Sequence, residues 1–292
     1  MKPSKFDYMR PVTIEEALNV LAAHNGDAKP LAGGQSLMPL LAFRLAAPSL
    51  LIDISRLPGL GGITIDSDGI RLGALVRWRD IEGNNALREH HPLLHAAIGH
   101  VAHYQIRNRG TVGGSLAHAD PAAEMPGVAV ACDAQLTIAS TSGKRIVAAE
   151  DFFISALVTD LAPDELITEV RLPPWKPNRI WTFEEFARRR GDFALAGIAL
   201  FYDPDEDGRA RNVHLGAIGV ADRPIRLRAA EAILEGCRVD ADAIMKVAVA
   251  ARAAVDPPDD IHASSDYRRV LIGVLIERGL SRAAGVGLHE AA

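Results

Sequence analysis

Two short glycine-rich stretches hold the residues best suited to ligand chemistry in this sequence. AGGQSL covers residues 32–37 and TVGGS covers residues 111–115, and each places a glycine pair after an apolar residue and near a serine. Glycine has no Cβ, so the backbone N–H groups of such a loop can approach an anion to hydrogen-bonding distance. Consecutive amides in a turn form a concave site for phosphate oxygens. Two loops of this kind could hold the pyrophosphate of a dinucleotide such as FAD or NAD.

The usual nucleotide-binding signatures are missing from the sequence. No G-x-G-x-x-G opens an early βαβ unit, because GLGGIT (59–64) lacks the third glycine, and there is no G-x-x-x-x-G-K-[ST]. Each glycine stretch alone could be an ordinary turn, since Gly and Ser are common loop residues. If the ligand is a dinucleotide, the sequence therefore predicts a fold other than the Rossmann fold.

Composition and charge restrict the class of protein. The chain has 292 residues, of which 48% are hydrophobic and 24% charged, as in an ordinary globular protein. A formal net charge of -5 argues against a nucleic-acid surface. Two cysteines, Cys132 and Cys237, are too few for a four-thiolate iron–sulfur cluster, so such a cluster would have to sit on another chain. Neither a signal peptide nor an 18-residue apolar run is present, which predicts a cytoplasmic protein.

The elements around the two stretches alternate between helices and strands. Thr13 and Glu16 have the capping-box spacing and predict a helix that ends near Gly26. Two further helices, separated near Pro92, are expected before the second glycine stretch. Strands are predicted at residues 29–31 and 49–55, in hairpins around Asp68-Gly69 and Ser142-Gly143, and at residues 165–172.

A proline-rich segment, PPWKP (173–177), is the best candidate for a domain boundary. Beyond it we expect a three-stranded antiparallel meander with a turn at DPDEDG (203–208). Three helices should follow, near residues 226–236, 240–255 and 266–280. The expected fold class is α+β, with a larger region of about 175 residues and a smaller domain after it.

Several polar clusters suggest other functions, and each has a simpler interpretation. His91 and His95, with Glu89 nearby, could bind a metal, but exposed histidines on an amphipathic helix are the favoured interpretation. His118 and Asp120 could form an acid–base pair. We favour a positioning role for them.

Three further candidates are weaker still. The run from Arg188 to Arg190 could contact nucleic acid, a flavin or a partner, or could be a solvated face. Ser115 lacks the G-x-S-x-G setting of a nucleophile. Asp203, Asp205 and Asp207 imitate the start of a calcium loop without its final glutamate, which predicts a turn.

Three motifs together resemble a known family. AGGQSLMPLL, RNRGTVGGSLAHADPAAEMP and FARRRGDFALAG are similar, in this order, to the FAD-binding medium subunit of molybdenum hydroxylases of the carbon monoxide dehydrogenase and xanthine dehydrogenase type. The resemblance covers the chain to about residue 285. It implies an FAD-binding fold of the vanillyl-alcohol-oxidase type at 1–176, in subdomains of about 1–55 and 56–176. A C-terminal domain with an antiparallel sheet and three helices (177–286) and a tail (287–292) would follow.

The resemblance also implies a set of cofactor-binding residues. The two glycine loops would wrap the FAD pyrophosphate, Glu124 would bind the adenosine ribose, Ile167 would pack near the adenine or flavin, and Phe193 would lie beside the isoalloxazine ring. The whole set is Ala32, Gly33, Gly34, Gln35, Ser36, Leu37, Thr111, Val112, Gly113, Gly114, Ser115, Asp120, Glu124, Ile167 and Phe193. Phe193 could equally be a core residue on sequence alone. Relatives often carry a lysine near position 184 or 185, whereas this chain has Glu184 and Glu185; either an arginine at 188–190 replaces it, or the flavin potential is lower.

The implied function is electron transfer. Electrons would pass from a molybdopterin large subunit through a [2Fe-2S] small subunit to non-covalent FAD on this chain, and then to an external acceptor. The complex implied by the resemblance is a dimer of heterotrimers. The alternative is a self-sufficient FAD-dependent oxidase or dehydrogenase with its own substrate pocket. The chain shows no covalent-flavin histidine motif and no obvious substrate base, which disfavours this alternative.

Overall fold

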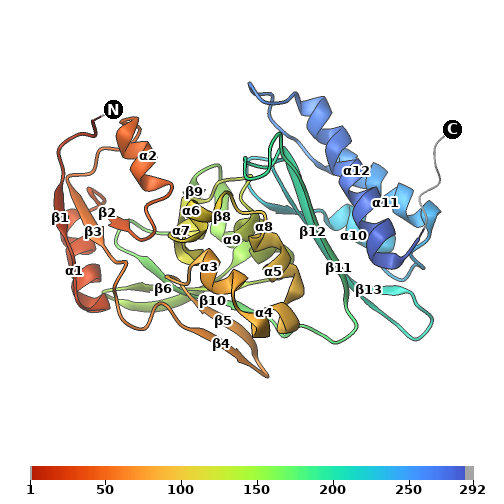
Figure 1. Ribbon diagram of the computed structural model, residues 1–292, viewed down its shortest axis with the longest axis horizontal. Helices are drawn as coiled ribbons and strands as arrows, with labels where there is room; N and C mark the ends of the chain where they lie inside the picture. The colour runs from red at the N-terminus through yellow and green to blue at the C-terminus, as the bar shows by residue number, and fades with distance from the viewer. Residues whose placement is uncertain (1, 287–292) are drawn as a thin grey trace.

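The computed structural model describes residues 2–286 as three units that follow one another along the long axis, each with its own β-sheet (Figure 1). The predicted tail at 287–292 lies outside the described residues. No helix in the described part of the chain has the length and apolar character of a membrane span.

The N-terminal unit is a small parallel sheet with two helices. Its elements are β1 (Asp7–Met9), α1 (Ile14–His24), β2 (Ala28–Leu31), α2 (Leu37–Ala42) and β3 (Leu50–Asp53), with strand order β1-β3-β2. The capping prediction is confirmed at Thr13, whose side chain accepts from the Glu16 N–H, while the Glu16 carboxylate accepts from Val12. α1 ends at Asn25, in the left-handed region, one residue before the predicted glycine.

The central unit is a five-stranded antiparallel sheet, in the order β4-β5-β10-β6-β7, covered by helices. Its elements are β4 (Ile63–Asp66), β5 (Gly69–Gly73), α3 (Trp78–Glu82), α4 (Asn85–His90), α5 (Pro92–Ile98), α6 (Tyr104–Arg107), α7 (Val112–His118), α8 (Glu124–Ala131), β6 (Gln135–Ser140), β7 (Gly143–Ala148), α9 (Ala149–Phe152), β8 (Phe153–Ser155), β9 (Val158–Thr159) and β10 (Leu166–Leu172). Both predicted hairpins are confirmed.

The predicted break near Pro92 is confirmed, because α4 ends at His90 and α5 begins at Pro92. The prediction of a single helix before this break is wrong, because α3 and α4 occupy that stretch, and the short α6 follows α5. Gly83 ends α3, and the Asn84 side chain then accepts from the Leu87 N–H to begin α4. A chain break that depends on one Gly-Asn pair leaves the apolar periodicity of the sequence almost unchanged.

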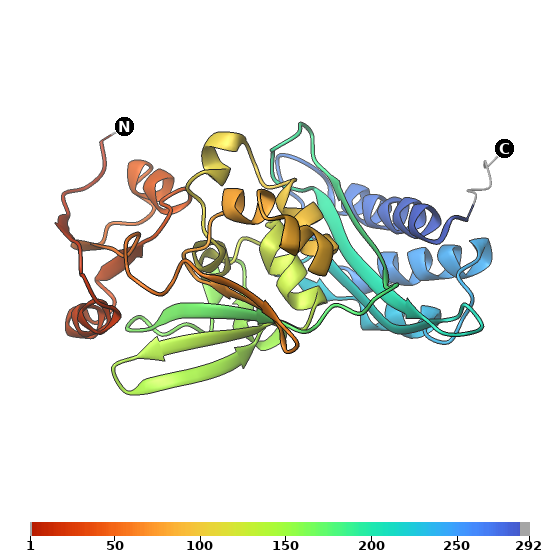
Figure 2. The ribbon, with the colours of Figure 1, turned by 60° about the horizontal axis from the view of Figure 1, so that its bottom comes forward.

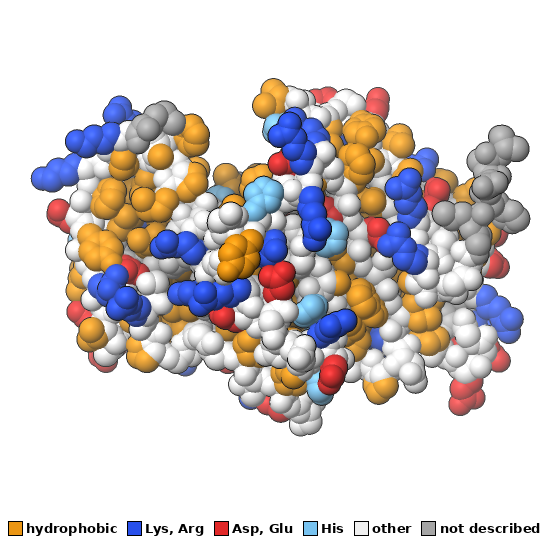
Figure 3. Space-filling view, in the orientation of Figure 1, with side chains coloured by type: hydrophobic (Ala, Val, Ile, Leu, Met, Phe, Trp, Pro, Cys, Tyr) orange, Lys and Arg blue, Asp and Glu red, His pale blue; other side chains and the backbone are white. Residues whose placement is uncertain are grey.

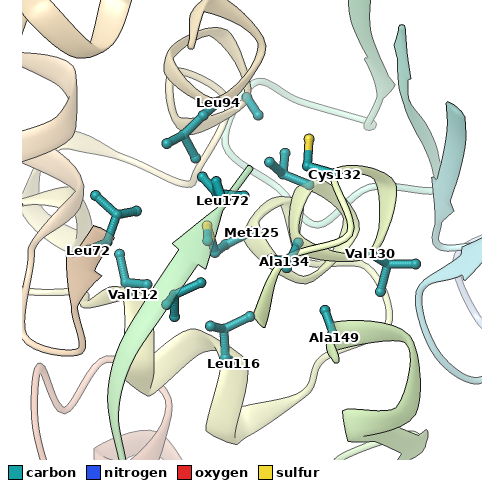
Figure 4. Packing of buried hydrophobic residues seen from close by; sticks show 14 of the residues in the cluster. Leu72, Leu94, Val112, Leu116, Met125, Val130, Cys132, Ala134, Ala149 and Leu172 are labelled. Carbon is teal, nitrogen blue, oxygen red and sulfur yellow. The ribbon is translucent and has the colours of Figure 1, made fainter. Parts of the chain in front are cut away.

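The core of the central unit joins the second glycine stretch to the sheet. Val112 and Leu116 of α7 are fully buried and pack with Leu72, Met125 and Leu172 (Figure 4). The N-terminus of α7 is therefore fixed by the same core that orients the sheet.

The C-terminal unit is a four-stranded antiparallel sheet between two layers of helices. Its elements are β11 (Ile180–Phe186), β12 (Ala196–Pro204), β13 (Ala210–Ile218), β14 (Ile225–Arg226), α10 (Arg228–Leu234), α11 (Ala241–Ala254) and α12 (Ser265–Ala284). Helices α10–α12 lie on the outer face, while α5 and α8 of the central unit lie against the inner face (Figures 1 and 2). The predicted meander and three helices are confirmed.

Helix α8 packs closely on this sheet because glycines face it. A Cβ on Gly216 would lie 2.7 Å from the Cβ of Ala131 and 3.0 Å from the carbonyl oxygen of Gly127. Helix α8 consequently lies against the C-terminal sheet along its length.

Candidate functional site

A cavity of about 870 Å³ brings the two glycine stretches together. Ala32, Gly33, Gly34 and Gln35 line it from the first stretch, and Thr111 lines it from the second. The hollow between the N-terminal unit and the rest of the molecule, with Lys and Arg side chains gathered below it, is visible in Figure 3. Segments almost 80 positions apart in the sequence therefore form one concave site.

The glycines allow the two loops to meet backbone to backbone. A Cβ on Gly33 would overlap the carbonyl oxygen of Arg109, so only glycine permits this approach. Gly34 has φ +72°, in the left-handed region that favours glycine. Gly113 instead packs against Ala74, which directly follows β5, and Gly114 is exposed. The first glycine pair thus lets the two loops meet, and Gly113 lets the second loop pack on the central unit. Gly114 is the exposed glycine of the second pair.

The first loop carries backbone donors that the protein does not use. Within residues 2–286, the N–H groups of residues 32–37 donate to no protein acceptor, although the Gln35 side chain bonds the Gly33 carbonyl at 2.9 Å. Ser36 is the N-cap of α2 but makes no capping hydrogen bond, and Leu37 begins that helix. Unused amides beside a cavity fit an anionic ligand with several acceptor oxygens.

Arginines give the cavity a positive wall. Arg77, Arg79 and Arg109 all line it, and Tyr104 lies at the same wall with a ring that is 67% exposed. Guanidinium groups bind phosphate oxygens through paired N–H donors. Sequence reasoning missed these residues, because no local pattern connects arginines about 30 positions apart.

The one carboxylate of the cavity wall is neutralised internally. Asp53 accepts from Arg10 at 2.7 Å, from Tyr8 and from the Ser55 N–H at 3.0 Å. Burial alone would raise its pKa, but these hydrogen bonds hold the pKa of Asp53 well below its usual value. The charge that faces the cavity is therefore positive. A pyrophosphate such as that of FAD fits this donor set.

The remaining predicted residues lie around the second loop and beyond the cavity wall. The Thr111 hydroxyl accepts from the Gly114 N–H at 3.2 Å, and Ser115 bonds back to the Thr111 carbonyl. Val112 is fully buried, and Ile167 lies in the core on β10, against which α7 packs.

Asp120 and Glu124 flank a second place, where the central and C-terminal units meet, and Phe193 precedes a segment that packs there. The Pro121 carbonyl, between Asp120 and Glu124, accepts from the Gly219 N–H at 2.9 Å. Gly219 in turn packs against the carbonyls of Ala194 and Leu195, directly after Phe193. The Phe193 ring is 69% exposed, so the alternative of a core phenylalanine is wrong.

Carboxyl groups at this second place hold their protons unusually well. Burial raises the pKa of Glu124 to about 7, and the charge of Asp120 adds to the effect. Burial also raises the pKa of Glu185 to about 8, with a contribution from Glu124. The Oε2 atom of Glu185 is 4.0 Å from Nδ1 of His100. Sequence reasoning noted Glu185 only as a departure from relatives and gave no indication of His100.

The metal site considered for His91 and His95 is not supported by the structure. Residues 2–286 contain no group of three His, Cys, Asp or Glu side chains arranged to hold a metal. The expectation that His91 is exposed is wrong: it is fully buried, caps α5 and lies 4.5 Å from the Trp175 ring. The Trp175 ring comes from the proline-rich segment and buries this histidine.

The other polar runs have structural roles or remain exposed. Asp203 bonds Arg179 at 2.7 Å, and Asp205 accepts from the N–H groups of Asp207 and Arg209, which is the predicted turn. The run 188–190 is exposed at the end of the β11–β12 hairpin.

Two family models cover most of the chain. Residues 4–175 match the FAD binding domain in molybdopterin dehydrogenase, and residues 181–283 match the carbon monoxide dehydrogenase flavoprotein C-terminal domain. These matches agree with the fold and with a site suited to a pyrophosphate.

Relatives are similar over their full length. The chain is 41% identical to the 6-hydroxypseudooxynicotine dehydrogenase complex subunit alpha of Paenarthrobacter nicotinovorans, covering 100% of this chain and 97% of the relative. It is 32% identical to the carbon monoxide dehydrogenase medium chain of Hydrogenophaga pseudoflava, covering 97% and 98%.

A solved structure gives the same result. Carbon monoxide dehydrogenase from Hydrogenophaga pseudoflava, in a form lacking the Mo-pyranopterin moiety, superposes with a TM-score of 0.95 at 34% identity, covering 98% of this chain and 99% of that chain. In this family the molybdenum and iron–sulfur centres belong to other subunits. The chain therefore belongs to the FAD-binding medium subunits of the molybdenum hydroxylases, oxidoreductases of the carbon monoxide dehydrogenase type.

Proposed function

We propose that this chain accepts electrons from a [2Fe-2S] subunit and passes them through FAD to an external acceptor. Bound FAD supplies the ability to join one-electron and two-electron chemistry. The chain's own residues bind and orient the cofactor. The observation that carries the proposal is the row of unused amides at 32–37, because residues 32–35 of that row line a cavity that Arg77, Arg79 and Arg109 also line.

The FAD pyrophosphate would lie between residues 32–37 and 111–115, held without a covalent bond. Its ring would point to the place where the central and C-terminal units meet, beside the exposed Phe193. Because Glu124 lies at that same place, we assign it to the ribityl hydroxyls next to the ring, in place of the adenosine ribose expected from the sequence. Ile167 would support the site through the core beneath α7.

We assign different roles to the two regions of the chain. Residues 1–176 would bind FAD, in subdomains of about 1–55 and 56–176, and residues 177–286 would close the ring end of the site. The iron–sulfur small subunit and the molybdopterin large subunit would carry the other centres, in a dimer of heterotrimers. Substrate oxidation would take place on the large subunit.

Gly114→Val tests the placement of the cofactor. Gly114 is exposed beside Ala32, and a branched side chain there would fill space next to Thr111 and the first loop. The variant is expected to purify without flavin and to remain folded. Gly61→Val, at a glycine with open space around it, is the matched control and should keep a full complement of FAD. Stoichiometric flavin in Gly114→Val would remove the second loop from the site.

Reconstitution tests the electron-transfer role. The purified chain should bind FAD, yet it should oxidise no organic substrate until the iron–sulfur and molybdenum subunits are added. Substrate turnover by this chain alone, at the rate of the full complex, would instead establish the self-sufficient oxidase or dehydrogenase.

A further inference from the structure

An ion pair supports the cavity wall from behind. Asp53, the last residue of β3, lines the cavity, although its side chain is only 8% exposed. Its Oδ2 atom accepts from Nε of Arg10 at 3.0 Å, from Nη2 of Arg10 at 2.7 Å and from the Tyr8 hydroxyl. The Tyr8 hydroxyl in turn accepts from Nη2 of Arg10 at 2.8 Å. We call Tyr8, Arg10 and Asp53 the strand-end cluster.

The sheet topology brings the strand-end cluster to the first glycine loop. Strands β1, β3 and β2 are parallel, so their carboxyl ends meet at the same end of the sheet (Figure 1). Asp53 is paired with Leu31, the residue before the loop at 32–37, and the Ile54 N–H bonds the Leu31 carbonyl at 3.0 Å. Neighbouring strands lie about 4.8 Å apart. The Asp53 carboxylate therefore lies close to the unused amides of the loop.

The carboxylate would hinder an anionic ligand if it stood alone. An unbalanced negative charge in the wall should weaken the binding of a doubly charged pyrophosphate on the order of tenfold or more. The Arg10 guanidinium supplies one positive charge, so the pair carries no net charge. Among residues 2–286, neither Arg10 nor Tyr8 lines the cavity. Arg10 is therefore placed to change the charge of the wall through Asp53.

We propose that Arg10 is a positioning residue for FAD, which acts through Asp53 by cancelling the negative charge of the cavity wall beside the first glycine loop. This inference rests on the proposed function, because it needs FAD in the cavity. Arg10 differs in this respect from the arginines at 77, 79 and 109, which line the cavity and can contact phosphate oxygens themselves.

A purely structural role for the strand-end cluster makes a different prediction. The backbone already pairs β1 with β3, at Asp7–Leu50, Tyr8–Leu51 and Met9–Ile52. The side-chain hydrogen bonds add to this ladder, and a structural role would require that they be kept. The electrostatic role requires only that the charges at positions 10 and 53 balance. Removing both charges together separates the two roles.

The test is the dissociation constant of FAD for the full chain, measured by flavin fluorescence titration. Arg10→Met should weaken binding about tenfold or more, and less at 1 M salt, where the Debye length falls to about 3 Å. Asp53→Asn alone should tighten binding, because the Arg10 charge is then unbalanced. The double variant Arg10→Met/Asp53→Asn should return to the wild-type constant. Arg71→Met is the matched control, since Arg71 pairs with Asp66 at 2.6 Å on the β4–β5 hairpin and does not line the cavity.

The double variant decides the matter. Weak binding in Arg10→Met that Asp53→Asn restores supports the proposal. Equally weak binding in Arg10→Met and in the double variant overturns it, because Arg10 would then contact FAD itself or only maintain the fold. Wild-type binding in Arg10→Met overturns it as well, while FAD binding by the wild type leaves the proposed function standing. If Arg10→Met does not fold, Asp53→Asn decides alone: tighter binding supports the proposal, and equal or weaker binding overturns it.

Discussion

The two ends of helix α8 meet the C-terminal unit with opposite chemistry. At its end, Arg226 bonds Asp133 at 2.7 Å and Glu231 at 2.5 Å, and His214 Nδ1 donates to the Ala131 carbonyl oxygen at 2.8 Å. We call this set the paired junction. At its start, no lysine or arginine among residues 2–286 forms an ion pair with Glu124 or Glu185, and His100 lies 4.0 Å from Glu185. We call these three the acidic junction.

The difference lies in how buried charge is balanced at each junction. In the paired junction each buried charge has an opposite charge, and Glu231 also accepts from the Leu215 N–H at 2.8 Å. The acidic junction leaves a buried oxygen without a partner. The paired junction thus holds the two units together through balanced charge, whereas the acidic junction leaves buried carboxyl groups unbalanced at the same boundary.

The largest effect is expected from breaking the paired junction. Arg226→Ala leaves Glu231 buried without its partner, so the free energy of unfolding should fall by about 3–5 kcal/mol. Urea denaturation measures this. Arg228→Ala is the matched control, because its side chain is 57% exposed and should contribute roughly 0–1 kcal/mol. A loss for Arg226→Ala no larger than for Arg228→Ala would contradict the structural role.

Removing Glu124 tests the acidic junction as a ligand site. Glu124→Ala should weaken FAD binding by about 1.5–3 kcal/mol, the range for hydrogen bonds to charged groups. The effect should be greatest above pH 7, where the carboxyl is ionised, since burial raises its pKa to about 7. Flavin fluorescence titration gives the dissociation constant, with Glu184→Ala as control. An unchanged constant would exclude Glu124 from the site.

The acidic junction should also make FAD-free protein less stable as pH rises. Burial raises the pKa of Glu185 from 4.5 to about 8, so between these values the folded chain binds a proton that the unfolded chain releases. Stability is therefore full below about pH 4.5 and is lost as pH rises through about 8. We expect a loss of about 1–3 kcal/mol that is largely absent in Glu185→Gln. Denaturation at pH 5, 7 and 9 measures it, and parallel curves for both proteins would rule it out.

The sequence predicted local features well and distant contacts poorly. The cap at Thr13, the hairpin at Asp68-Gly69 and the two glycine loops depend on neighbouring residues, and each can be recognised in a few positions. The acidic junction depends on residues 100, 124 and 185, which no local pattern connects. The burial of His91 similarly depends on Trp175, 84 positions away.

The smallest effect on stability is expected at Phe193. Phe193 is 69% exposed, so Phe193→Ala should change the free energy of unfolding by no more than about 0.5 kcal/mol. A buried phenylalanine would instead cost about 3–5 kcal/mol, and Phe183→Ala, at a ring that is 8% exposed, provides that comparison. An aromatic face beside the flavin can stack on it and limit access of the acceptor. The reoxidation rate of reduced FAD should therefore change in Phe193→Ala while the melting temperature does not, and an unaltered rate would place Phe193 away from the ring.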